Sequence, residues 1–345
     1  MRRRRGLWII LLAAPLVLVA ADTVYWEFAV RRLEEGFAAW LAQQRAAGWT
    51  EVHQAPVRGG WPLAATLTVT DVTLQGGEPD IPGGLAWSAE TVVLRVALPQ
   101  PGVLDVVPAG RQRLRIAGSP DITYVADRLR LVVPLDAAPW PRFVDLAADN
   151  LHADTPLGGD AGAGSLRLRL DIRPEARTGE PLITFALKAS SITPPSGVVR
   201  PLGPRIAAFA ADGALNGPMP AGHSLADRAA AWRDGGGSLE LRHLTLGWGP
   251  LDLNASATLA LDEQLQPMGA GNARVIGYAE TLDALASHAA ISRSAATAAK
   301  AVLSLLANSP DDGSPPDVEV PLTLQYRTLS MRQVPLVRLP ELDWP

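Results

Sequence analysis

The sequence predicts a mostly β protein with some α structure (α+β): a large curved antiparallel sheet, a few covering helices and an N-terminal membrane-anchor helix. Apolar and polar residues alternate at period two through much of residues 50–345, which is typical of strands with one face in water. The 31 glycines and 30 prolines separate these runs as turn residues. Hydrophobic residues make up 48% of the 345 residues and charged residues 19%, so the chain can bury a core.

The chain begins with an anchor signal. Arg2–Arg5 precede an apolar run over residues 7–21, and positive charges favour the cytoplasmic side of a membrane. We therefore expect a single-pass inner-membrane protein with the bulk of the chain in the periplasm. A cleaved signal peptide stays open, because about fifteen apolar residues are fewer than the ~20 of a usual span and residues 19–21 fit a cleavage site. The anchor side chains are Leu7, Trp8, Ile9, Ile10, Leu11, Leu12, Leu16, Val17, Leu18 and Val19.

A helical pattern continues beyond that site through residues 22–48. Its apolar residues recur at steps of three and four, and Gly48 is a suitable helix end. Tyr25 and Trp26 also fit the aromatic belt of a membrane interface. One helix that leaves the bilayer and enters the domain is the simpler interpretation, so we favour an uncleaved anchor. The apolar positions are Tyr25, Ala29, Leu33, Phe37, Trp40 and Leu41.

From about residue 50 the period changes from helical to two. Residues 165–170 show the clearest alternation, with leucines expected to face a core and arginines to face water. Glycine and proline between the runs favour an antiparallel meander over strand–helix units. The predicted strands are residues 63–74, 91–98, 114–116, 122–125, 128–133, 165–170, 182–189, 238–246, 251–261, 272–278, 318–326 and 329–336.

Two helical segments interrupt the strands. Residues 224–232 begin with Ser224 and Asp227 at the spacing of an N-terminal cap. Residues 281–307 carry apolar stripes, and a break at residues 291–294 divides them into two helices. The predicted organisation is a cytoplasmic tip and anchor (1–21), an amphipathic helix (22–48), a first β-rich half (49–200) and a second β-rich half with helices (201–345), in one continuous fold.

No residue pattern identifies a reaction, so we expect a protein that is not an enzyme, with no catalytic residue and no cofactor. The absence of cysteine excludes thiolate metal sites, and the five histidines lack metal-ligand spacing. No basic block follows the N-terminal tip, which argues against nucleic acid as a partner. Residues 222–226 resemble the nucleophile elbow of hydrolases, but residues 217–220 before them cannot form a central strand. A serine hydrolase using Ser224 is therefore a remote alternative to a helix cap.

Three of the ten tryptophans are candidates for ligand contacts. Trp61, Trp87 and Trp248 each adjoin a turn. Large aromatic side chains at such places favour a role as plugs at the ends of a sheet, and a ligand-lined groove is the second interpretation.

Several short motifs together point to one family. They are Arg45–Trp49, Gly59–Pro62, Ala231–Gly236, Leu246–Leu251, Leu261–Gly269 and Val320–Leu324. With this set the chain resembles the DUF2125 family of alphaproteobacterial proteins of unknown function over nearly its whole length. These motifs are turns and strand edges, so the resemblance carries over no catalytic residue. A looser resemblance to AsmA-like envelope proteins rests on architecture and implies lipid handling or envelope maintenance.

We expect a non-enzymatic envelope role in which a lipid or another apolar ligand binds in a groove of the sheet, with the membrane and lipid as partners. A curved sheet with more apolar strand face than two helices can cover leaves such a groove. The alternative is an envelope scaffold or assembly partner with a closed β core. The residues do not identify its protein partners.

Overall fold

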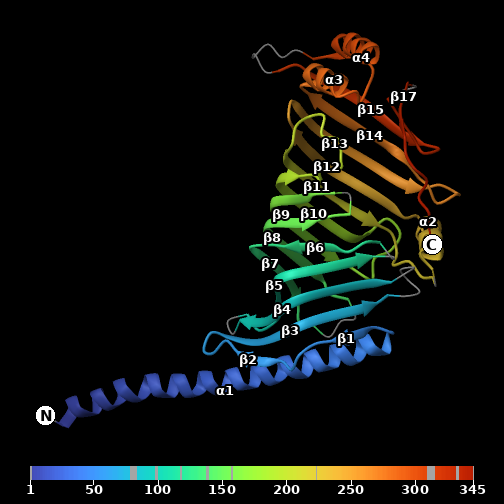
Figure 1. Ribbon diagram of the computed structural model, residues 1–345. Coiled ribbons are helices and arrows are strands. Elements are labelled where there is room, and N and C mark those ends of the chain that lie inside the picture. Colours follow the sequence, from blue (N-terminus) through green and yellow to red (C-terminus); the bar gives the residue numbers. More distant parts are fainter. Residues whose placement is uncertain are drawn as a thin grey trace.

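The computed structural model describes residues 2–77, 84–97, 100–116, 119–136, 140–156, 158–222, 224–308, 315–331 and 334–344, and no side chains for 2–16, 18 and 334. These residues form four helices and one seventeen-stranded sheet (Figure 1). The helices are α1 (Arg2–Ala46), α2 (Leu225–Asp234), α3 (Tyr278–Ser287) and α4 (Arg293–Leu306). The strands are β1 (Thr50–Val52), β2 (Val57–Gly59), β3 (Ala64–Gly76), β4 (Leu85–Ala97), β5 (Val103–Ile116), β6 (Ile122–Val125), β7 (Arg128–Pro134), β8 (Phe143–Asp154), β9 (Asp160–Ile172), β10 (Pro181–Thr193), β11 (Ile206–Asn216), β12 (Ser238–Trp248), β13 (Leu251–Leu261), β14 (Pro267–Ile276), β15 (Asp317–Gln325), β16 (Thr328–Met331) and β17 (Val334–Arg338).

The sheet is an antiparallel meander, as the alternating sequence predicts. Strands β8 to β17 each pair with the next one in the chain. At the first edge β1 and β2 both pair with β3, and β6 and β7 share the space between β5 and β8. Hydrogen bonding continues from β10 to β11 across the proline-rich residues 194–205. Figure 1 shows the strand direction rotating from β3 to β15, the twist expected of a large sheet.

Sequence reasoning missed four strands, β1, β2, β8 and β11, and merged β16 and β17, which pair antiparallel, into one predicted strand over residues 329–336. Alanine, glycine and aspartate fill many positions of β8 and β11, so the contrast between their two faces is weak in the sequence. The predicted strand over residues 272–278 is wrong at its end. Gly277 turns the chain with a φ of 72°, and Tyr278 is the first residue of α3.

Helix α1 is continuous from Arg2 to Ala46. It ends at a Schellman motif in which the Trp49 N–H donates to the Gln44 carbonyl at 2.9 Å and the Gly48 N–H donates to the Arg45 carbonyl at 3.0 Å. Gly48 has the left-handed φ of 82° that this motif requires, which confirms the predicted helix end. Within the described part of the chain, no helix has both the length and the hydropathy needed to cross a membrane.

The C-terminal half of α1 lies on the first strands of the sheet. Val30 (0% exposed) and Leu33 pack in one cluster with Leu67 of β3 and other apolar side chains of β3 and β4. The indole N–H of Trp26 donates to two backbone carbonyls, at 3.2 Å and 3.0 Å, on either side of the turn between β2 and β3. Trp26, which the sequence suggested for a membrane interface, therefore holds the helix on the sheet.

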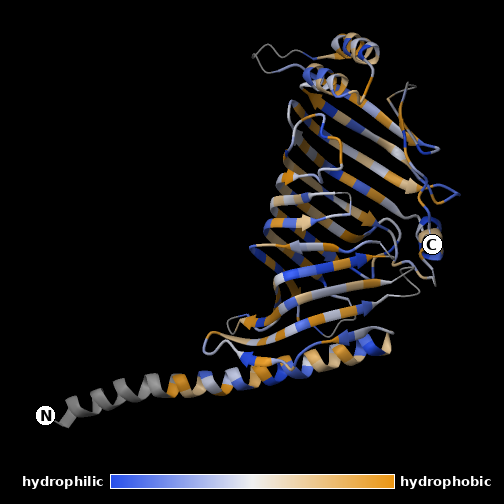
Figure 2. Ribbon diagram, in the orientation of Figure 1, coloured by the Kyte–Doolittle hydropathy of each residue, from blue (hydrophilic) through white to orange (hydrophobic). Residues whose placement is uncertain are grey.

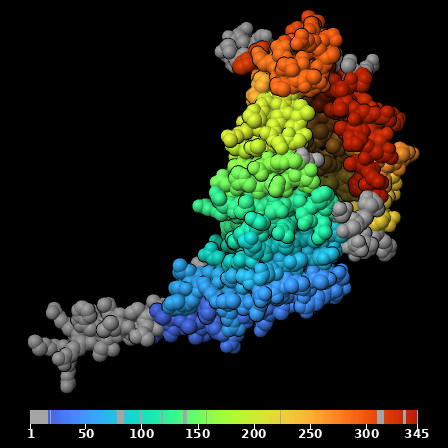
Figure 3. Space-filling view, in the orientation of Figure 1, coloured from blue at the N-terminus to red at the C-terminus, as the bar shows by residue number. Residues whose placement is uncertain are grey.

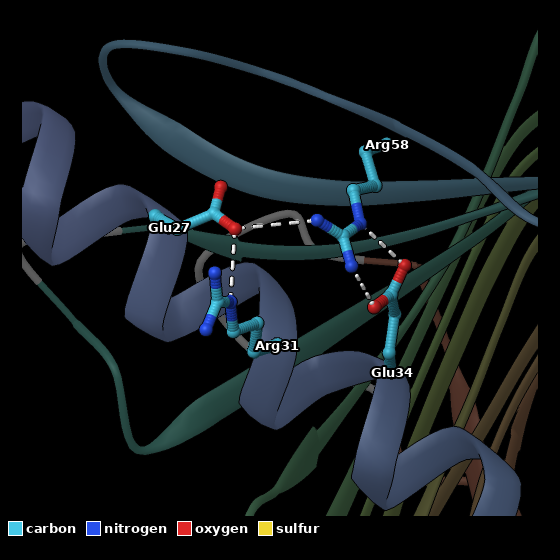
Figure 4. A network of polar contacts seen from close by, with 4 residues as sticks. All are labelled: Glu27, Arg31, Glu34 and Arg58. Carbon is cyan, nitrogen blue, oxygen red and sulfur yellow. Dashed lines mark hydrogen bonds and ion pairs between the residues drawn. The ribbon is translucent and has the colours of Figure 1, made fainter.

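A polar network fixes the same helix to β2 (Figure 4). Arg58 of β2 donates to both carboxylate oxygens of Glu34, at 2.6 Å and 2.5 Å, and also contacts Glu27 at 3.3 Å. Arg31 pairs with Glu27 at 2.9 Å along the helix. The hydrogen bonds from Arg58 hold the pKa of Glu34 below its usual value, because they favour the ionised carboxylate.

Helices α2, α3 and α4 all lie between residues 225 and 306 of the chain. Helix α2 begins at a full capping box: the Ser224 hydroxyl accepts from the Asp227 N–H at 3.0 Å, and the Asp227 carboxylate accepts from the Ser224 N–H at 3.3 Å. Helices α3 and α4 are separate, which confirms the predicted break. Tyr278 of α3 and Leu303 of α4 pack with Ala273 and Val318 of β14 and β15.

Candidate ligand groove

Cross-strand pairing aligns apolar side chains into one row across twelve strands. Directly paired residues in an antiparallel sheet point to the same face, so each pair extends the row by one strand. Successive strands are about 4.8 Å apart, which makes the row roughly 50 Å long. The apolar row consists of Leu67, Leu94, Val106, Leu131, Leu146, Leu168, Leu187, Ala211, Leu244, Ala255, Ala273 and Val320.

A second row on the same face is equally apolar. It runs from β7 to β15 and consists of Leu129, Ala148, Leu166, Ala189, Phe209, Leu246, Leu253, Val275 and Val318. We call the side of the sheet that carries both rows the apolar face. The opposite face carries ion pairs, such as Arg167 with Asp149 at 2.5 Å and Arg169 with Asp145 at 2.9 Å. Figure 2 shows this alternation of hydrophobic and hydrophilic residues along the strands.

The ends of the apolar row are covered and its middle is open. The buried members are Leu67 and Leu94 beside α1, Ala273 and Val320 beside α3 and α4, and Ala211. The partly exposed members are Val106, Leu131, Leu146, Leu168, Leu187, Leu244 and Ala255. Figure 3 shows the molecule hollowed between its red C-terminal segment and the green-to-orange wall facing it. The middle strands therefore present apolar side chains that stay partly exposed to solvent in the described structure.

An open cavity of about 1100 Å³ lies between α1 and this face. Helix α1 lines it with Tyr25, Ala29, Leu33, Phe37, Trp40 and Leu41, the six positions that the helical period singled out. The sheet contributes apolar side chains from β3 to β8, among them Leu94, Val106, Leu131 and Leu146 of the apolar row. The cavity, called here the α1 cavity, thus lies where α1 covers the apolar face.

Most of the α1 cavity lining is apolar, and its polar side chains include Arg32, Gln43, Gln44, Glu51, His53 and Asp136. The Trp87 indole N–H donates to the Tyr124 hydroxyl at 2.8 Å, so both groups are satisfied within the lining. Burial raises the pKa of Tyr124 above its usual value, and the bond from Trp87 offsets this in part. Both groups are therefore neutral at physiological pH, and neither adds a charge to the lining.

The three candidate tryptophans lie in different places. Trp87 lines the α1 cavity. Trp61 is 50% exposed in the turn between β2 and β3 and is not part of that lining. Trp248 ends β12 and donates its indole N–H to the Gly203 carbonyl at 3.0 Å, so it plugs the end of the sheet. The structure brings only Trp87 to the candidate site and leaves the other two with the role of turn residues.

The geometry around Ser224 is that of a helix cap. Its hydroxyl accepts from the backbone of α2, as described above. Asp262 and His288 follow Ser224 in the chain, as the acid and base of a hydrolase triad do, but Asp262 accepts from the backbone N–H groups of Gln264 and Gln266 in its own turn. The His288 ring lies 2.9 Å from the Ala284 carbonyl in its own helix. Among the described residues, no three His, Asp or Glu side chains gather as metal ligands would.

Most lining residues of the α1 cavity were missed as site residues by sequence reasoning. The pattern that could have found them was already visible: the apolar stripe of α1 and the period-two strands after it. Which strand positions oppose one another is set by hairpin register, and bulges shift that register at several pairs, including β4 with β5. One sequence cannot supply that register.

Comparison with known proteins gives one match. Residues 26–340 match the DUF2125 family, described as an uncharacterized protein conserved in bacteria. No curated protein and no solved structure is significantly similar to the chain. The family match covers nearly the whole sheet together with the part of α1 that roofs the cavity, and the chain therefore belongs to DUF2125.

Proposed function

We propose that this protein binds a lipid along the apolar face of its sheet, in a non-enzymatic role in the cell envelope. The observation that carries the proposal is the apolar row, whose members on β5 to β13 are partly exposed except for Ala211, and which opens into a cavity of about 1100 Å³. Leaving apolar surface in water costs about 25 cal/mol per Å². A long apolar surface of this kind favours an apolar occupant.

The dimensions favour a chain-like ligand. Drug-sized molecules occupy pockets of roughly 300–1000 Å³, and the α1 cavity reaches or exceeds that range. One leaflet of a bilayer has a hydrocarbon depth of ~15 Å, half of the ~30 Å core, so the row of roughly 50 Å is long enough for more than one acyl chain end to end. The two rows offer no side-chain hydrogen-bond donor or acceptor, which suits methylene chains.

The location is proposed from the N-terminal sequence. Arg2–Arg5 before an apolar run support an N-terminus in the cytoplasm, an anchor in the inner membrane and a sheet in the periplasm. The sheet would then stand beside the membrane that supplies the lipid. A topology reporter fused after Pro345 tests this: activity only in the periplasm supports it, and activity only in the cytosol contradicts it.

The scaffold alternative requires a closed β core. The partly exposed middle of the apolar row argues against closure, because a packed core leaves such leucines fully buried. A scaffold predicts that the full chain purifies with a stable protein partner and without lipid.

Native mass spectrometry of the full chain, extracted in mild detergent, tests lipid binding. We expect noncovalent adducts of lipid mass that disappear on denaturation, and a rise in melting temperature when lipid is added back to stripped protein. A bare chain whose melting temperature does not respond to phosphatidylglycerol or phosphatidylcholine vesicles would overturn the proposal.

A further inference from the structure

The α1 cavity has one uncompensated charge. Its lining includes Glu51 and Asp136, but Glu51 is paired with Arg45 and Asp136 is paired with Arg142 at 2.6 Å. The Arg45 hydrogen bond lowers the pKa of Glu51, as expected for a carboxylate neutralised by a guanidinium. Arg32 lines the same cavity, and in the described part of the chain it forms no ion pair.

The position of Arg32 suits it to a ligand. Its guanidinium lies 5.4 Å from the centre of the Phe28 ring, one turn earlier on α1. A cation over an aromatic face is held in place while its N–H edge stays free to donate. Arg31, the preceding residue, instead pairs with Glu27 in the network of Figure 4. The chain thus neutralises Arg31 and leaves Arg32, which faces the cavity, without a counter-charge.

We propose that Arg32 is the headgroup site of this cavity and that the bound lipid is an anionic phospholipid. This inference rests on the proposed function. A phosphate oxyanion fits the planar fork of an arginine through two parallel N–H···O bonds. The acyl chains would then extend from Arg32 over the apolar lining, which contains Val106, Leu131 and Leu146. A zwitterionic lipid carries its own cation and gains less from a single guanidinium.

The test is a competition between two lipids that share the same acyl chains. Stripped full chain is mixed with vesicles of equal dioleoylphosphatidylglycerol and dioleoylphosphatidylcholine, re-isolated and analysed for both lipids. We expect the wild type to enrich phosphatidylglycerol roughly two- to fivefold, the range of an exposed ion pair. The enrichment should shrink as salt is raised, because the contact is screened.

Two substitutions locate the effect. Arg32→Gln should bring the lipid ratio down to that of the vesicles, and Arg32→Lys should keep part of the preference. The matched control is Arg113→Gln on β5, which removes the same charge from an exposed side chain. Leu114 pairs with Trp87, which lines the cavity, so Leu114 lies on the cavity side of the sheet. Arg113 is its neighbour in the strand and therefore points to the opposite face. The control should enrich phosphatidylglycerol like the wild type.

The outcomes separate this inference from the proposed function. Lipid bound by the wild type without a preference, or a preference that survives Arg32→Gln, overturns the headgroup assignment and leaves lipid binding intact. No bound lipid of either kind overturns both. An equal loss of preference in Arg32→Gln and Arg113→Gln would mean that overall charge, and not the cavity, selects the lipid.

Discussion

Replacing Leu146 by glutamate should weaken lipid binding strongly without unfolding the sheet. Leu146 lies in the middle of the apolar row, lines the α1 cavity and is partly exposed. Its cross-strand partners on the same face are Leu131 and Leu168, so neither directly paired residue offers a cation to a new carboxylate. In the empty protein the carboxylate can reach water. An acyl chain laid over it would remove that water.

The expected loss of binding free energy follows from this difference between the empty and the lipid-bound protein. A buried polar group without a partner costs about 1–3 kcal/mol, and a charged group costs more. We therefore expect at least ~2 kcal/mol of lost binding free energy, which is roughly a thirtyfold rise in Kd. The assay is an equilibrium titration of stripped protein with cis-parinaric acid, a fatty acid that fluoresces in apolar surroundings.

The matched control is Ala147→Glu, one residue further along β8. Ala147 points to the opposite face, between Arg130 of β7 and Arg167 of β9, where a carboxylate gains partners. We expect its Kd to stay within about twofold of the wild-type value, because an exposed pair changes free energy by only ~0.2–1 kcal/mol and lies away from the ligand. If both variants bind alike and both melt near the wild-type temperature, the apolar face is not the binding surface.

Three further predictions concern the helices. Trp26→Phe removes the indole N–H that joins α1 to the turn after β2, so urea unfolding should show a loss of about 1–2 kcal/mol, and an unchanged midpoint would contradict the contact. Arg58 lowers the pKa of Glu34 in the folded protein. The stabilisation from this pair is therefore complete above pH 4.5, the ordinary pKa of the carboxyl, and is lost as pH falls through the lower folded-state pKa. Glu34→Gln should flatten that acid dependence of the melting temperature. Ser224→Ala should cost about 1 kcal/mol of stability through loss of the α2 cap and leave lipid binding unchanged, whereas altered binding with normal stability would give Ser224 another role.

The sequence predicted those parts of the fold that depend on local chemistry. Period-two alternation found strands such as β9, the serine and aspartate at 224 and 227 found the start of α2, and Gly48 found the end of α1. Each of these signals lies within a few neighbouring residues, so one sequence contains it.

The rest depends on which strands meet. The apolar stripe of α1 was visible, but its contact with β3 and β4, and the cavity that α1 roofs, depend on how the helix lies on the sheet. Trp26 fitted a membrane interface by composition, and only the packed fold shows its indole bonded to the turn after β2. Nothing in the sequence distinguishes Arg32 from the other arginines of α1. The structure does so, because the lining carboxylates Glu51 and Asp136 are paired with other arginines and Arg32 is the unpaired charge in the described lining.

Site-specific photo-crosslinking on β10 tests whether a lipid lies along the apolar face of the sheet. Leu187 belongs to the apolar row, and Lys188 beside it is exposed on the opposite face. A benzophenone amino acid is incorporated at position 187 or at position 188 of the full chain, and the cells are irradiated. The protein is then purified and its intact mass is measured by mass spectrometry. We expect lipid adducts at position 187 and none at position 188. Adducts at neither position, or equal adducts at both, would contradict a lipid lying along the apolar face.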